Sequence, residues 1–122
     1  MKVVSTKKAP AAIGPYSQGY IAGNLIYTSG QLGIDPKTGQ YEDCIRWQTE
    51  RSCQNVKAIL EEAGTGLDKV IKTTCFLADM KDFAVFNEVY ARYFTSKPAR
   101  STVAVKTLPK NMLCEIEAIA VI

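Results

Sequence analysis

The sequence has 122 residues, of which 47% are apolar and 22% charged. These proportions are ordinary for a globular protein and exclude disordered, collagen-like and coiled-coil chains, while the length suits a single domain over 1–122. The formal net charge of +3 comes from dispersed basic residues, which argues against nucleic acid as the main partner. The absence of histidine excludes Ser-His-Asp triads, Cys-His pairs and HExxH zinc sites. Any acid–base chemistry therefore falls to Asp, Glu, Lys, Tyr, Cys or bound water.

Short strands and loops are predicted over the first forty residues. In chain order they are a β-prone run at 2–5, a loop with Pro and Gly at 6–18, and strands at 19–22 and 25–31. Gly23-Asn24 lies between these two strands and is typical of a two-residue hairpin turn. The Asp-Pro-Lys-Thr-Gly cluster at 35–39 predicts a further turn.

Helical spacing begins near residue 43. Over 43–63 apolar residues recur at helical spacing, with Asp43 as the expected N-cap and Gly64 as the expected residue after the helix. A second helix is predicted over 80–95, where Asn87 interrupts an apolar stripe. A buried amide needs hydrogen-bond partners, so Asn87 either bonds a loop backbone in the core or belongs to a site. The remaining predicted strands are 70–78, 101–107 and 113–122.

The order of these elements predicts an α+β fold in which two helices cover one face of the sheet. On the last strand, Glu115 and Glu117 share a face with two apolar residues, and the opposite face is wholly apolar. Beyond Glu117 the strand is apolar on both faces, which is typical of a strand that is covered on both faces. Because a monomer of this size has nothing left to cover the second face, we expect a homo-oligomer.

Arg100 stands at the start of a predicted strand, where alternation places it on the same face as Thr102. On the other face, the set of Ser101, Val103 and Val105 fits the helix-covered side, so Arg100 is expected to point to the subunit interface. A guanidinium in that place favours a carboxylate, because its fork binds two oxygens at once. That carboxylate belongs either to a ligand or, in a structural ion pair, to Glu115 or Glu117.

Other polar residues are weaker candidates. Glu115 and Glu117 lie about 7 Å apart along their strand, so one could pair with a basic group while the other acts as a base. A solvated strand edge is the alternative. Tyr16 and Ser29 stand beside glycines, which permits a ligand to approach the backbone closely, although turn chemistry explains the same pattern.

The four cysteines form no CxxC pair, which excludes zinc-ribbon and thioredoxin motifs, and no metal site is expected. No basic or aromatic context marks a reactive thiolate, so all four are expected to be small core residues. The sequence contains no secretory signal and no apolar run of about 20 residues. We therefore expect a cytoplasmic protein with reduced thiols and no membrane partner.

Seven segments, in this order, carry a specific pattern: Ala11-Ala12-Ile13-Gly14-Pro15-Tyr16-Ser17-Gln18, Thr28-Ser29-Gly30-Gln31, Asn55-Val56-Lys57-Ala58-Ile59-Leu60, Asp82-Phe83-Ala84-Val85-Phe86-Asn87, Pro98-Ala99-Arg100-Ser101, Leu108-Pro109-Lys110 and Glu115-Ile116-Glu117-Ala118-Ile119-Ala120. With them the chain resembles the RidA family, the YjgF type that is also called L-PSP endoribonuclease, over essentially its whole length. The resemblance implies a chorismate-mutase-like fold with a mixed sheet and two helices on one face. It also implies a homotrimeric barrel with sites in the clefts between subunits.

The activity that the resemblance implies is hydrolysis of reactive 2-enamine and 2-imine acids to 2-oxo acids and ammonia, without a cofactor. Examples of such substrates are 2-aminoacrylate and 2-iminobutanoate. The alternative is a non-catalytic trimer of the same fold that binds a small carboxylate or RNA and regulates rather than catalyses.

Residue by residue, the resemblance assigns Arg100 to the substrate carboxylate and Glu115 to the attacking water. The remaining pocket residues that it implies are Tyr16, Ser29, Asn87 and Thr102. Thr102 stands where many members have cysteine, which removes a thiol from the site. The connector Thr95-Ser96-Lys97 is shorter than in many members, which leaves the cleft rim and the substrate size open.

Overall fold

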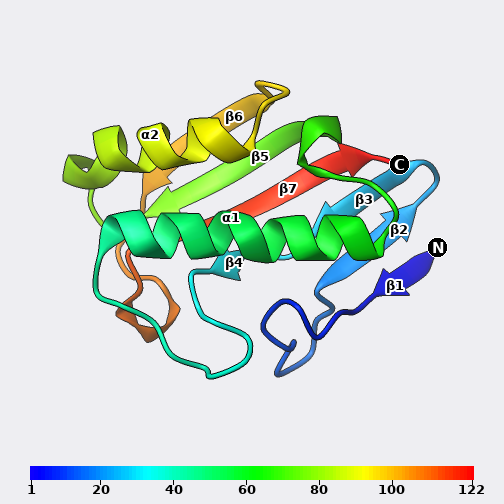
Figure 1. Cartoon of the computed structure of the whole chain (residues 1–122), viewed down its shortest axis with the longest axis horizontal. Helices are drawn as coiled ribbons and strands as arrows, with labels where there is room; N and C mark the ends of the chain where they lie inside the picture. Colours follow the sequence, from blue (N-terminus) through cyan, green and yellow to red (C-terminus); the bar gives the residue numbers. More distant parts are fainter.

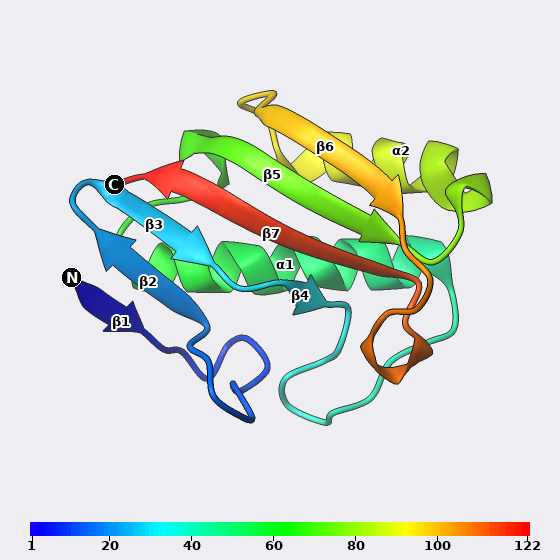
Figure 2. The ribbon, with the colours of Figure 1, turned by 180° about the vertical axis from the view of Figure 1, so that it is seen from behind.

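The structure is a computed structural model that describes all 122 residues, from Met1 to Ile122. Six strands form a sheet in the order β1-β2-β3-β7-β5-β6, and β4 also pairs with β7 (Figures 1 and 2). The strands are β1 (Lys2–Val4), β2 (Gly19–Ala22), β3 (Leu25–Thr28), β4 (Gln31–Leu32), β5 (Val70–Leu77), β6 (Ala99–Ala104) and β7 (Cys114–Val121). The helices are α1 (Ile45–Glu62) and α2 (Phe83–Tyr93), with 3₁₀ turns η1 (Leu67–Lys69), η2 (Met80–Asp82) and η3 (Pro109–Asn111).

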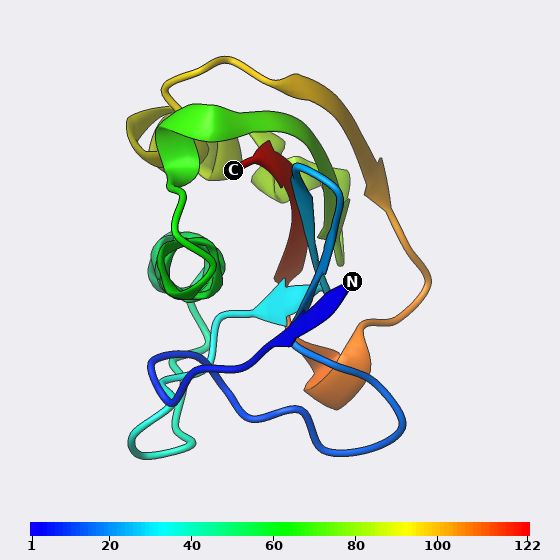
Figure 3. The same ribbon diagram turned by 90° about the vertical axis from the view of Figure 1, so that its right-hand side faces the viewer.

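The sheet is mixed, because β5 and β6 run parallel while the other pairs are antiparallel. Both α-helices pack on one face of it, and Figure 3 shows this layer edge-on. The predicted α+β class is confirmed. Neither helix is both long enough and apolar enough to cross a membrane.

The core fills the space between the helices and the sheet. Its central members from α1 and the sheet are Cys53, Val56, Ile59, Leu60, Ile26, Cys75, Leu77 and Ile116. Burial alternates along β7, where Cys114, Ile116, Ala118 and Ala120 are buried and the residues between them are partly exposed. The predicted division of this strand into two faces is therefore confirmed, and the partly exposed residues define the open face of the sheet.

The first helix begins one residue later than its sequence indicates. Cys44 occupies the N-cap position and no side chain caps the helix, so the prediction of Asp43 as the N-cap was wrong. The helix ends as predicted, with Gly64 just after it: Gly64 adopts a φ of +90° and its N–H donates to Glu61 O at 3.0 Å. Thr65 N–H donates to Leu60 O at 3.0 Å, which completes a Schellman motif.

The second helix is preceded by η2, so its α-helical part starts at Phe83 rather than at residue 80.

The strand predicted over 25–31 divides into β3 and β4, with Ser29 and Gly30 between them. Thr28 Oγ1 accepts a hydrogen bond from Ala118 N at 3.0 Å, so a side chain replaces the backbone partner where the ladder stops. The N–H and the hydroxyl of Ser29 both donate to Gln18 O, at 2.9 and 3.1 Å. This break places Ser29 and Gly30 beside the middle of β7, because Tyr27 pairs with Ile119 and Gln31 with Ile116. The predicted hairpin is confirmed, since Ala22 pairs with Leu25 across Gly23-Asn24.

Three cysteines are buried and one is not. Cys53, Cys75 and Cys114 belong to the core, whereas Cys44 is exposed, so the prediction that all four are core residues was wrong for Cys44. Burial raises the pKa of the Cys75 thiol to about 11 and that of Cys114 to about 12. Both groups therefore stay protonated near neutral pH, which makes them poor nucleophiles.

Candidate active site

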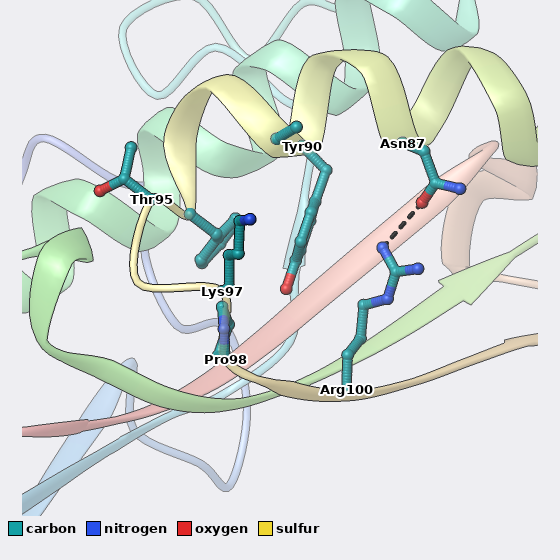
Figure 4. A pocket seen from close by; sticks show the side chains of 8 residues that line it. Asn87, Tyr90, Thr95, Lys97, Pro98 and Arg100 are labelled. Atoms are coloured by element: carbon teal, nitrogen blue, oxygen red, sulfur yellow. Dashed lines mark hydrogen bonds between the residues drawn. The ribbon is translucent and has the colours of Figure 1, made fainter.

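Arg100 and Asn87 meet between β6 and α2. Arg100 Nη1 donates a hydrogen bond to Asn87 Oδ1 at 2.7 Å (Figure 4). The guanidinium carbon lies 4.8 Å from the ring centroid of Tyr90 and 5.5 Å from that of Phe83. These cation–π contacts and the amide fix the arginine head in one place. The amide that interrupts the apolar stripe of α2 is thus the group that positions Arg100.

Arg100 faces the helices and not the open face, so the prediction of its direction was wrong. In the parallel ladder Arg100 pairs with Thr73 of β5, which is buried and hydrogen-bonds the Tyr90 hydroxyl at 2.6 Å. The apolar residue Val103 lies on the open face instead and is 46% exposed. The physical reason is that β6 is an edge strand, and α2 supplies an amide and aromatic rings on its inner side. The amide and the rings hold the Arg100 guanidinium on the helix-covered face, where the sequence had predicted apolar residues.

The guanidinium of Arg100 has no carboxylate partner within the chain. The ion pairs of the structure are Arg46–Glu88 at 3.1 Å and Arg92–Glu88 at 3.2 Å, both on the exposed side of the helices. The structural ion pair with Glu115 or Glu117 is therefore not formed inside one chain. The guanidinium therefore has N–H groups for which the chain provides no carboxylate acceptor.

A cavity of about 500 Å³ opens beside this arginine, between the second half of α2 and the start of β6. The lining residues that matter here are Asn87, Tyr90, Phe94, Lys97, Pro98 and Arg100. Thr102 follows Arg100 on the same face of β6, opposite Cys75. Its hydroxyl oxygen is buried and has no hydrogen-bond partner in the chain. We name Arg100, Asn87, Tyr90 and Thr102 the arginine cluster.

Glu115 lies on the open face, in a second cavity of about 640 Å³. Tyr16 and Ser29 line the same cavity, together with Gly30 and Lys110. Burial raises the pKa of the Glu115 carboxyl, and the negative charge of Glu117 raises it further. We name Glu115, Tyr16 and Ser29 the glutamate cluster.

Gly30 leaves room for the carboxyl group of Glu115. A Cβ at position 30 would overlap the Glu115 carboxyl, whose end is flexible and can move away. A Cβ at Gly33 would instead overlap the backbone of Gln48 in α1, which cannot. The two glycines therefore have different roles, one beside a candidate catalytic group and the other in helix packing.

We expect Gly30→Ala to fold and to lower turnover roughly tenfold or more, because displacement of a reacting group by about 1 Å is costly. Gly33→Ala is the matched control and should lose about 2 kcal/mol of stability, or roughly 10 °C in Tm. Thermal unfolding and initial rates measured on both variants separate the two effects. Normal turnover in a well-folded Gly30→Ala protein would contradict a role for the Glu115 position.

The two clusters lie on opposite faces of the sheet. Glu115 pairs with Phe76 and stands on the open face, whereas Arg100 pairs with Thr73 and stands under α2. The structure thus gathers the predicted residues into two groups and does not bring the groups together within one chain.

Tyr90 and Gly30 belong to these sites but were not predicted as site residues from the sequence. The position of Tyr90 three residues after Asn87 on the same helix face was the available signal.

The sequence profile of the family described as Endoribonuclease L-PSP matches residues 6–122. The chain belongs to the Endoribonuclease L-PSP family. It is 54% identical to a RutC family protein of Pyrococcus abyssi, with 98% of this chain and 95% of that protein covered. It is 48% identical to a 2-iminobutanoate/2-iminopropanoate deaminase of Salmonella typhimurium, with 98% and 97% covered.

Solved structures of the L-PSP family have the same fold. The structure of E. coli TdcF with bound serine superimposes with a TM-score of 0.96 at 44% identity, covering 100% of this chain and 99% of TdcF. The RidA resemblance predicted from the sequence is confirmed, and relatives named as imine deaminases support an enzymatic role for this L-PSP family member.

Proposed function

We propose that this protein hydrolyses small 2-imino acids, and the 2-enamine acids from which they form, to 2-oxo acids and ammonia. The observation that carries the proposal is the Arg100 guanidinium, which is held by Asn87 and two aromatic rings and lacks a carboxylate within its own chain. A relative that is named for this activity matches nearly the whole chain.

In the proposed complex, Arg100 binds the substrate carboxylate. One N–H of its fork is taken by Asn87, and the remaining N–H groups are available for two carboxylate oxygens. This contact fixes the substrate so that the imine carbon presents one face to water. Tyr16 and Ser29 line the cavity at Glu115 and offer hydroxyl groups to the substrate, while Thr102 lies beside Arg100 with its hydroxyl oxygen buried.

The reaction needs one weak base. An imine carbon is already electrophilic, so water can add once it is positioned. Glu115 takes a proton from the water as its oxygen bonds to C2, and the raised pKa of this carboxyl suits that task. The proton then passes to the amino nitrogen, which gives a carbinolamine. A second proton moves from the C2 hydroxyl to the nitrogen, through Glu115 or water, so that the C–N bond breaks and ammonia leaves as the C2–O bond becomes a carbonyl. Water and the side chains of the chain suffice for these steps.

We further propose that each site joins the arginine cluster of one subunit to the glutamate cluster of its neighbour in a homotrimer. Arg100 and Glu115 lie on opposite faces of one sheet, so a shared substrate needs two chains. Partly exposed apolar side chains on the open face, such as Tyr20, Tyr27 and Val103, favour burial against another subunit. A head-to-tail ring places unlike surfaces together in this way.

The activity is tested by following 2-iminobutanoate, made by a threonine dehydratase, as its semicarbazone. Wild-type protein should suppress the semicarbazone signal and speed the release of 2-oxobutanoate. Unchanged signals with a folded protein that still binds 2-oxobutanoate would support the regulatory alternative instead.

The shared site is tested by mixing inactive subunits. Arg100→Ala and Glu115→Ala chains are refolded together in equal amounts, and each variant alone serves as a control. In a randomly assembled head-to-tail ring, about a quarter of the sites pair an intact Arg100 with an intact Glu115. Recovery of about a quarter of wild-type activity is expected, and no recovery would contradict a site shared between subunits.

A further inference from the structure

We infer that the cavity beside Arg100 selects imino acids with a second carboxylate, and that Lys97 is the residue that binds this second group. The inference rests on the proposed function, because it names the class of substrate for the same site. Lys97 lines the same cavity of about 500 Å³ as Arg100, and in Figure 4 the Tyr90 ring lies between the two side chains.

The cavity holds two cations and no acidic side chain among its lining residues. The nearest acidic residue in sequence, Glu88, follows Asn87 but is bound on the outer side of the helices by Arg46 and Arg92. Glu115 and Glu117 are on the other face of the sheet. The positive charge of the cavity is therefore not compensated within the chain. One substrate carboxylate would neutralise Arg100 and leave the charge of Lys97 available.

The backbone holds Lys97 in place at the rim. Its φ of +51° is a left-handed conformation that is unfavourable for any residue except glycine. Two hydrogen bonds maintain it: Lys97 N–H donates to Phe94 O at 3.3 Å, and the hydroxyl of the preceding Ser96 donates to Val70 O at 2.6 Å. Pro98 follows and restricts the backbone further. No ion pair of the chain accounts for this lysine.

The chemistry of the lining suits a short dicarboxylic acid. Tyr90, Phe94 and Pro98 offer apolar walls for a few methylene groups. Arg100 provides a planar fork for the carboxylate next to the imine, and the flexible ammonium of Lys97 provides a point charge for the distal carboxylate.

Binding of stable product analogues tests the inference without relying on turnover. Calorimetry gives Kd for 2-oxoglutarate and for 2-oxobutanoate with wild type, Lys97→Met and Lys97→Glu. The control is Lys57→Met, which makes the same charge change at an exposed site of α1. Wild type should prefer the dicarboxylate. Lys97→Met should lower this preference roughly three- to fivefold, and Lys97→Glu should lower it further.

Two results would overturn the inference: equal affinity of wild type for the two ligands, or a preference that Lys97→Met reduces no more than Lys57→Met does. Lys97→Arg keeps the charge and should keep the preference, which guards against a misfolded Met variant. Hydrolysis of the imines that amino-acid oxidases form from glutamate and from methionine separates the two claims. Absence of turnover with both imines would defeat the proposed function, while the dicarboxylate preference in calorimetry would stand or fall independently.

Discussion

Arg100→Ala is expected to lower kcat/KM for 2-iminobutanoate roughly 30- to 5,000-fold. Loss of a charged, partly desolvated hydrogen-bond partner of a carboxylate costs about 2–5 kcal/mol, and 1.36 kcal/mol corresponds to a factor of ten. The aromatic rings of Tyr90 and Phe83 and the amide of Asn87 would remain but carry no positive charge. The semicarbazone assay measures the loss directly, and calorimetry with 2-oxobutanoate should show weaker binding as well.

Two further variants sharpen this result. Arg100→Lys keeps a charge but lacks the planar fork, so it should recover only part of the activity. Arg92→Ala removes an exposed arginine of α2 whose partner Glu88 keeps its contact with Arg46, and its kinetics should match wild type. Equal turnover by Arg100→Ala and Arg92→Ala would remove Arg100 from the binding site.

Glu115→Gln is expected to abolish most of the turnover, by roughly 100- to 10,000-fold, while binding of 2-oxobutanoate persists. The amide has nearly the shape of the carboxyl group but cannot take a proton from water. A pure binding protein would instead show no turnover in the wild type and would bind 2-oxobutanoate equally well after the change. Loss of binding together with turnover would mean that Glu115 holds the ligand rather than acting on water.

The pH dependence gives a second measurement of the same group. Glu115 acts when it is deprotonated, so kcat/KM should fall as the pH is lowered through its raised pKa. The charge of Glu117 contributes to this raised value, so Glu117→Gln should lower the pKa of Glu115 and move the acidic limb to lower pH. A shift to higher pH, or none, would contradict this coupling.

Local patterns predicted much of the fold, because they depend on neighbouring residues alone. The hairpin at Gly23-Asn24 and the end of α1 at Gly64 follow from glycine conformations that few other residues adopt. The division of strand 25–31 could not be predicted in this way. It depends on Thr28 and Ser29 bonding to Ala118 and Gln18, which are distant in sequence.

The candidate site shows the same division between local and tertiary information. The sequence singled out Asn87 as an amide in an apolar stripe, and its partner proved to be Arg100. The face of Arg100 was predicted wrongly, because alternation says which residues share a face but not which face the helices cover on an edge strand. Only the placement of α2 over β6 decides that question.

The two clusters draw on different stretches of the chain. Ligand anchoring uses residues from the α2–β6 segment, whereas the groups around Glu115 come from the N-terminal loop, the β3–β4 break and β7. In the proposed trimer, evolution can therefore vary the connector at 95–97 and change which acids are accepted without disturbing the hydrolytic half. Because the two halves of the site come from separate stretches of the chain, proteins with this fold can differ in substrate specificity and still keep the same hydrolytic residues.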